Sequence, residues 1–115
     1  MIEPKIVGAA DLPASPLDAA DMFYDELLPV FRKFIAEEGD TIIAFEYADP
    51  SHDGWRLAAV QELARESVPS RVNGLVGGIS DAMHKAALFI AYAPGVTGQI
   101  FTIDAIEDAR GYSTV

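Results

Sequence analysis

The chain has 115 residues, half of them hydrophobic, which fits one domain with its own core, and the absence of cysteine excludes disulfides and thiolate chemistry. Eighteen acidic residues against eight basic ones give a formal net charge of -10, which disfavours nucleic acids and anionic membranes as partners. No apolar run approaches the roughly 18 residues of a membrane span. The amino terminus lacks a basic segment followed by a long apolar one, so we expect no signal peptide and a cytoplasmic protein.

The first predicted elements are a strand and a long helix. Lys5–Ala9 is a short apolar run typical of a strand. After a loop with two prolines, Ser15 can cap a helix that begins near Pro16 and ends near Glu38. Pro29 lies in the middle of this helix, where it removes one backbone hydrogen bond and should bend the axis.

A second strand and helix follow. Thr41–Phe45 is a continuous apolar and β-branched run, as expected of a strand buried on both faces. The polar loop from Tyr47 to Gly54 comes next, and in it Asp53 can cap a helix that runs to about Ser67.

The last third of the chain is predicted to hold a strand over Arg71–Val76, a helix capped by Ser80 that ends near Ala93, and a strand over Gln99–Ile103. Strands that alternate with helices indicate the α/β class, with about four parallel strands covered by helices.

The organisation along the chain predicts one folded unit. We expect residues 1–104 to form a single domain and residues 105–115 to form a polar, loose C-terminal tail, because the composition changes after the last strand.

The first helix carries an apolar arc that is wider than packing on one sheet requires, and the second helix has small residues that allow close approach. We therefore expect these two helices to form a protein interface, across which Phe31→Glu would dissociate a dimer. The side chains assigned to this interface are Phe23, Tyr24, Leu27, Leu28, Phe31, Phe34, Ile35, Trp55 and Ala59.

An alternative function rests on the loop before the second helix. Glu46, Asp49 and His52 are close in sequence, and with the glycines Gly77 and Gly78 they could form a small-ligand site or an active site. Carboxylates with one imidazole could also hold a metal ion, but no second histidine or cysteine stands at ligand spacing, so we expect no metal site. Loops of this composition are more commonly turns and helix caps.

Three segments, in order, carry a family resemblance: LARE at 63–66, RVNGLVGG at 71–78 and TGQIFTID at 97–104. They resemble the LA-x-E, RVN…PG and TGQ…VDGG segments in the C-terminal half of a short-chain dehydrogenase/reductase. The earlier run IVGAAD at 6–11 resembles that family's LVNNAG strand, and Leu28-Pro29 resembles its LP. The likeness runs from about Lys5 to Asp104.

The resemblance implies a truncated Rossmann-like three-layer sandwich that lacks the first strand and its glycine-rich dinucleotide loop. It places Asp49 and Asp53 where the family has its catalytic Tyr and Lys, so we expect no catalytic residues and no bound NAD or NADP. Gly77 and Gly78 stand where the family has Pro-Gly beside the nicotinamide, but a strand-ending turn is the favoured interpretation.

The resemblance also has consequences for architecture and assembly. It implies that the third helix covers the face of the sheet opposite the first two. It implies contacts across a two-fold axis through the first two helices. We therefore expect a non-catalytic domain that acts as a homodimer, or as a subunit that binds a dehydrogenase-like partner.

Overall fold

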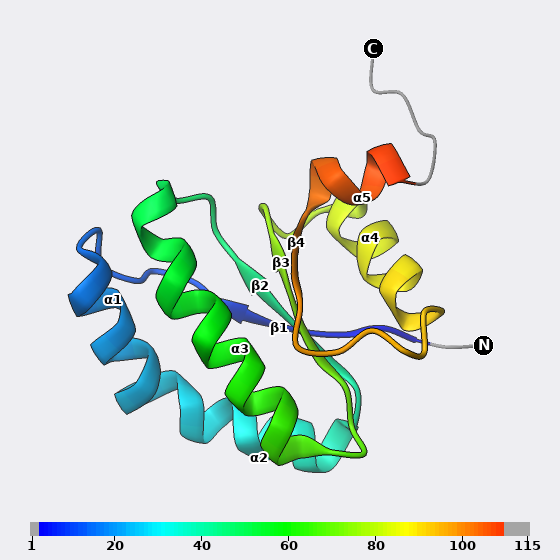
Figure 1. Cartoon of the computed structure of the whole chain (residues 1–115), viewed down its shortest axis with the longest axis horizontal. Helices are drawn as coiled ribbons and strands as arrows, with labels where there is room; N and C mark the ends of the chain where they lie inside the picture. The colour runs from blue at the N-terminus through cyan, green and yellow to red at the C-terminus, as the bar shows by residue number, and fades with distance from the viewer. Residues whose placement is uncertain (1–2, 110–115) are drawn as a thin grey trace.

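The computed structural model describes residues 3–109, and it shows a four-stranded parallel sheet between two layers of helices (Figure 1). The strands lie in the order β1-β2-β3-β4, each parallel to the next. This confirms the predicted α/β class. The elements in chain order are β1 (Lys5–Ala9), α1 (Pro16–Met22), the π-helical turn η1 (Phe23–Leu27), α2 (Leu28–Glu38), β2 (Thr41–Phe45), the 3-10 turn η2 (Pro50–His52), α3 (Asp53–Ser67), β3 (Val72–Val76), α4 (Asp81–Ala91), β4 (Ile100–Thr102) and α5 (Ile103–Ala109).

The two faces of the sheet are covered by different helices. In β2, Ile43 and Phe45 pack with α2 and α3, whereas Ile42 and Ala44 pack with α4 and α5. Figure 1 shows α1, α2 and α3 on one side of the sheet and α4 and α5 on the other. The expected position of the third helix, now α4, is confirmed. Because all three crossovers advance in the same direction across the sheet, the last has the opposite hand to the first two.

The predicted first helix is continuous, but its winding changes before Pro29. Its start is capped as expected, since the Ser15 hydroxyl accepts a hydrogen bond from the Asp18 amide (3.5 Å). A π-helical turn over Phe23–Leu27 joins α1 to α2. A proline lacks the amide hydrogen and crowds the carbonyl four residues earlier, and a wider turn at this point relieves that conflict.

The start of α3 differs from the sequence prediction. Asp53 is the first residue of α3, and it is not the cap. Asp49 is instead the cap of the preceding turn η2, because its carboxylate accepts hydrogen bonds from the amide (2.9 Å) and hydroxyl of Ser51. The turn η2 then leads directly into α3.

The end of the described chain also differs from the prediction. β4 stops at Thr102, and α5 replaces the loose segment expected after residue 104. The Thr102 hydroxyl accepts a hydrogen bond from the Ala105 amide (3.1 Å), which favours a helical turn. Ile103 and Ile106, three residues apart, are both buried in the cluster that contains α4. The part of the expected tail at 110–115 lies outside the described residues.

Candidate functional site

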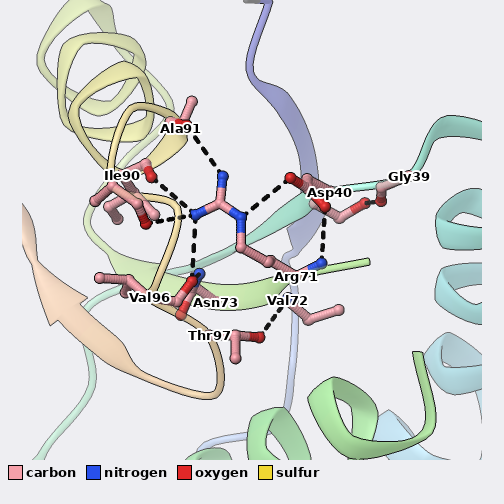
Figure 2. Close-up of polar contacts among 11 residues, drawn as sticks. Gly39, Asp40, Arg71, Val72, Asn73, Ile90, Ala91, Val96 and Thr97 are labelled. Carbon is pink, nitrogen blue, oxygen red and sulfur yellow. Dashed lines mark hydrogen bonds and ion pairs between the residues drawn. The ribbon is translucent and has the colours of Figure 1, made fainter. Parts of the chain in front are cut away.

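The RVN segment lies at the amino end of β3, where Arg71 joins three parts of the chain (Figure 2). Its amide and Nε both donate to the Asp40 carboxylate, at 2.8 and 3.1 Å. Its terminal nitrogens donate to carbonyls in the last turn of α4 and in the loop that follows. These acceptors are Ile90, Ala91, Ala93 and Val96, at 2.7 to 3.3 Å. Arg71 therefore caps the carboxyl end of α4.

Asn73 completes this connection. Its side-chain nitrogen donates to the Val96 carbonyl (3.0 Å), and its side-chain oxygen accepts from the Gln99 amide (3.1 Å). The Val72 amide donates to the Thr97 hydroxyl (3.1 Å). The RVN segment thus holds the loop between α4 and β4 in place, which is a structural role. We call Arg71, Asn73 and their acceptors the RVN clamp.

The glycines that follow β3 serve the turn. Gly77 has a φ of +153°, a backbone conformation that side chains disfavour, and an added Cβ would overlap the side chain of Ile103. Gly78 is exposed, with no atom within 4 Å of an added Cβ. Neither glycine lines the cavity that contains the other candidate ligand residues.

That cavity lies at the carboxyl ends of β1 and β2, and it measures about 230 Å³. We call it the β1–β2 cavity. Its walls include Ala9, Leu12, Glu46, Asp49, His52 and Arg56. The fold therefore brings together the three predicted residues Glu46, Asp49 and His52, and it adds an arginine that sequence analysis did not single out.

His52 is buried and uses both ring nitrogens within the chain. Its Nδ1 accepts from the Trp55 indole N–H (3.1 Å), because that group can only donate. Its Nε2 lies 3.0 Å from the Ala14 carbonyl, which can only accept. The ring therefore carries its hydrogen on Nε2 and fastens the start of α3 to the loop after β1. No lone pair is left for a metal ion or for proton abstraction.

The two carboxylates have structural contacts as well. Glu46 accepts from the Asp11 amide (2.9 Å), and Asp11 adopts a left-handed backbone conformation with φ +60°. The hydroxyl and then the amide of Ser51 lower the pKa of the Asp49 carboxyl. Within residues 3–109, no group of three histidine or acidic side chains is arranged to hold a metal ion.

Unlike Glu46, Asp49 and His52, Arg56 is a polar residue of the cavity without a hydrogen-bond partner in the described chain. The residue is only 6% exposed, and its guanidinium carbon lies 4.8 Å from the centre of the Phe45 ring and 5.9 Å from Trp55. Among the described residues it makes no hydrogen bond or ion pair, and its Nε is buried without a partner. Burial lowers the pKa of Arg56, and the nearby carboxylates of Asp53 and Glu46 oppose that shift.

The burial of Arg56 could have been predicted from its spacing to the apolar residues of the same helix. Arg56, Val60 and Leu63 stand at i, i+4 and i+7, and the last two are core residues of α3. An arginine on the buried stripe of a helix is unusual enough to mark it for attention.

The predicted interface residues divide by burial. Phe23, Phe31, Ile35 and Ala59 are buried in the chain's own core. Tyr24 is 44% exposed, and Leu27, Leu28, Phe34 and Trp55 are half-buried. The apolar arc is wide partly because α1 and α2 pack against both the sheet and α3. Since Phe31 is 1% exposed, Phe31→Glu would disrupt folding before it could report on a dimer.

Comparison with protein families identifies the family of the chain. The SDR-like family model, described as short chain dehydrogenase-like protein, matches residues 7–103. No curated protein and no solved structure matches the chain. The matched residues run from β1 to the first residue of α5, so they include both the RVN clamp and Arg56. No helix in the described part of the chain is long and apolar enough to cross a membrane.

Proposed function

Because the chain belongs to the SDR-like family of short chain dehydrogenase-like proteins, we propose for it a function that keeps this fold without dehydrogenase chemistry. The proposed function is assembly into a homodimer through the outer side of α1, α2 and α3. By the family resemblance, Asp49 and Asp53 stand in place of a tyrosine and a lysine. Two carboxylates cannot supply a phenol and an ammonium, and Asp49 is already the cap of η2.

The observation that carries this proposal is the exposure of apolar side chains on these helices. Leu17 and Tyr24 are exposed and seven residues apart, so they lie on the same side of the helix. Val30 of α2 is 57% exposed, and Leu57 of α3 is also exposed. The core beneath these helices is already filled by Phe23, Phe31 and Ile35, so the exposed side chains are available for a second molecule.

The mass of the protein in solution tests this proposal. We expect light scattering after size exclusion to give twice the monomer mass at micromolar concentration, with a standard interface of about 1,600 Å². Tyr24→Glu should raise the dissociation constant of the dimer by at least about tenfold, because a carboxylate would enter an apolar contact.

Ile79→Glu is the matched control for this experiment. Ile79 is also apolar and exposed (74%), but it lies just before α4, the helix on the other face of the sheet (Figure 1). The control should leave the dimer unchanged. A monomer mass for the unmutated protein would contradict the proposal, and so would equal weakening by both variants.

A second candidate function is the binding of a small molecule, and Arg56 is the specific observation that favours it. Its guanidinium carries five N–H donors, and the Nε–H among them is buried with no acceptor from the described residues. A buried donor without a partner is rare in folded proteins, and a bound molecule is one way to satisfy the Arg56 Nε–H.

A further inference from the structure

We propose that Arg56 anchors a binding site for a small, neutral carbonyl compound whose apolar part occupies a second cavity, beside β3 and β4. This inference rests on the second candidate function, and it specifies the ligand class and the position. It uses other residues than the assembly proposal, except for Leu57, which both proposals use.

The second cavity lies between α3 and the carboxyl ends of β3 and β4, and it measures about 260 Å³. We call it the β3–β4 cavity. It is lined mainly by the apolar residues Leu57, Val76, Ile100 and Phe101, with Asp53 and Thr102 as polar neighbours. Arg56 lines both this cavity and the β1–β2 cavity.

The position of the guanidinium is fixed by aromatic rings, which leaves its hydrogen-bond donors unused. Arg56 lies over the Phe45 ring, and Trp55 lies on the same guanidinium at a longer distance. Cation–π contacts use the field of the aromatic face and consume no N–H group. The planar fork is therefore positioned in advance for an oxygen acceptor.

The shape of the β3–β4 cavity favours an apolar molecule with one polar end. Ligand sites in proteins are mostly apolar with a few convergent polar groups, and this cavity has that composition. The β1–β2 cavity is less suitable, because the groups of Glu46, Asp49 and His52 on its wall already have partners.

The surrounding charge decides between a carbonyl and a carboxylate. The carboxylates of Glu46 and Asp53, which line the two cavities together with Arg56, act on its charge, although neither forms an ion pair with it within 4 Å. A carboxylate ligand would add a third negative charge around one positive charge, in a chain of net charge -10. A neutral carbonyl oxygen accepts from the guanidinium without that repulsion.

Three probes of similar size test this inference by NMR: acetophenone, benzoate and ethylbenzene. We expect acetophenone to shift the Arg56 Nε–H signal and the methyl signals of Val76 and Ile100 in a saturable manner at millimolar concentration. Benzoate and ethylbenzene should each bind at least about tenfold more weakly, one because of its charge and the other because it lacks an acceptor. A hydrogen bond to a charged group is worth about 1.5–3 kcal/mol, which corresponds to tenfold or more.

Two variants complete the experiment. Arg56→Met should weaken acetophenone binding by at least about tenfold, because the donor is lost while the apolar bulk remains. Arg65→Met is the matched control, since Arg65 lies on the same helix with its side chain exposed, and binding should not change.

The other outcomes overturn separate parts of the inference. Tighter binding of benzoate would contradict the neutral class but leave a ligand function standing. Shifts at Leu12 in place of Val76 would move the site to the β1–β2 cavity. Equal binding by Arg56→Met would show that Arg56 is no anchor. Saturable shifts from none of the probes would contradict the inference and the ligand function together.

Discussion

Two arginines at opposite ends of the same sheet, Arg56 buried and Arg71 partly buried, have opposite environments. Arg71, at the amino end of β3, donates from Nε and both terminal nitrogens to a carboxylate and four carbonyls. Arg56, at the carboxyl end, lies between aromatic rings and donates to no described residue. The arginine side chain thus has hydrogen-bond acceptors at position 71, whereas at position 56 it has none among the described residues. The Arg56 Nε–H is therefore the buried donor that still has no partner among the described residues.

The largest loss of stability should come from removing the hydrogen bonds of Arg71. Arg71→Met leaves the carbonyls at the end of α4 without their donor and Asp40 without its cation. We expect the free energy of unfolding to fall by about 3 kcal/mol, as for other hydrogen-bonded buried charges. Urea denaturation followed by circular dichroism measures this. Arg65→Met, on an exposed side chain, should change it by less than about 0.5 kcal/mol. A loss for Arg71→Met as small as this control would mean that the clamp adds little stability.

Arg56→Met should change the free energy of unfolding by less than about 1 kcal/mol in either direction. No hydrogen bond to the described residues is lost, and the cost of burying a charge disappears. Methionine also packs well against the rings of Phe45 and Trp55. The same urea experiment compares it with Arg71→Met. Equal losses for the two variants would contradict the distinction between the arginines.

A third arginine, on the surface, should show the smallest effect. Arg32 donates from Nε and a terminal nitrogen to Glu66 at 2.7 and 2.8 Å, and these hydrogen bonds lower the pKa of the Glu66 carboxyl. Because the folded pKa lies below the unfolded one, the stabilisation is present above the unfolded pKa. It is lost as the pH falls through the folded pKa.

Removing this surface pair should therefore alter the pH dependence more than the stability at neutral pH. Both side chains are about half exposed, so solvent screens the pair. We expect Arg32→Met to lower the urea midpoint slightly at pH 7 and to flatten its decline between about pH 5 and pH 3. An unchanged decline would show that the Arg32–Glu66 pair makes no contribution to acid unfolding.

The sequence predicted the strands well, because their apolar runs are continuous and are separated by turn residues. It also predicted the caps at Ser15 and Ser80, since a hydroxyl before a helical pattern has a local effect. It missed α5, which depends on the packing of Ile103 and Ile106 against α4. A short polar stretch gives little sign of such a tertiary contact.

The candidate site was only partly predictable. Glu46, Asp49 and His52 do meet at one cavity, as their closeness in sequence suggests. Their hydrogen bonds to Asp11, Ser51, Trp55 and Ala14 could not be read from the sequence, because backbone geometry decides them. Arg56 was missed because the environment of an arginine, not its identity, makes it unusual. The wide apolar arc of the first helix was read as interface, although its members Phe23, Phe31 and Ile35 fill the core.

Trp55 is the only tryptophan of the chain, and its surroundings make it an optical probe of one end of the sheet. Its ring contacts Phe23, Phe45 and His52, and it lies beside the Arg56 charge. Tryptophan emission therefore responds to the carboxyl end alone, whereas far-ultraviolet dichroism averages over every helix and strand. Recording both signals in one unfolding titration shows whether the carboxyl end of the sheet unfolds together with the rest of the chain, in one cooperative step, or separately.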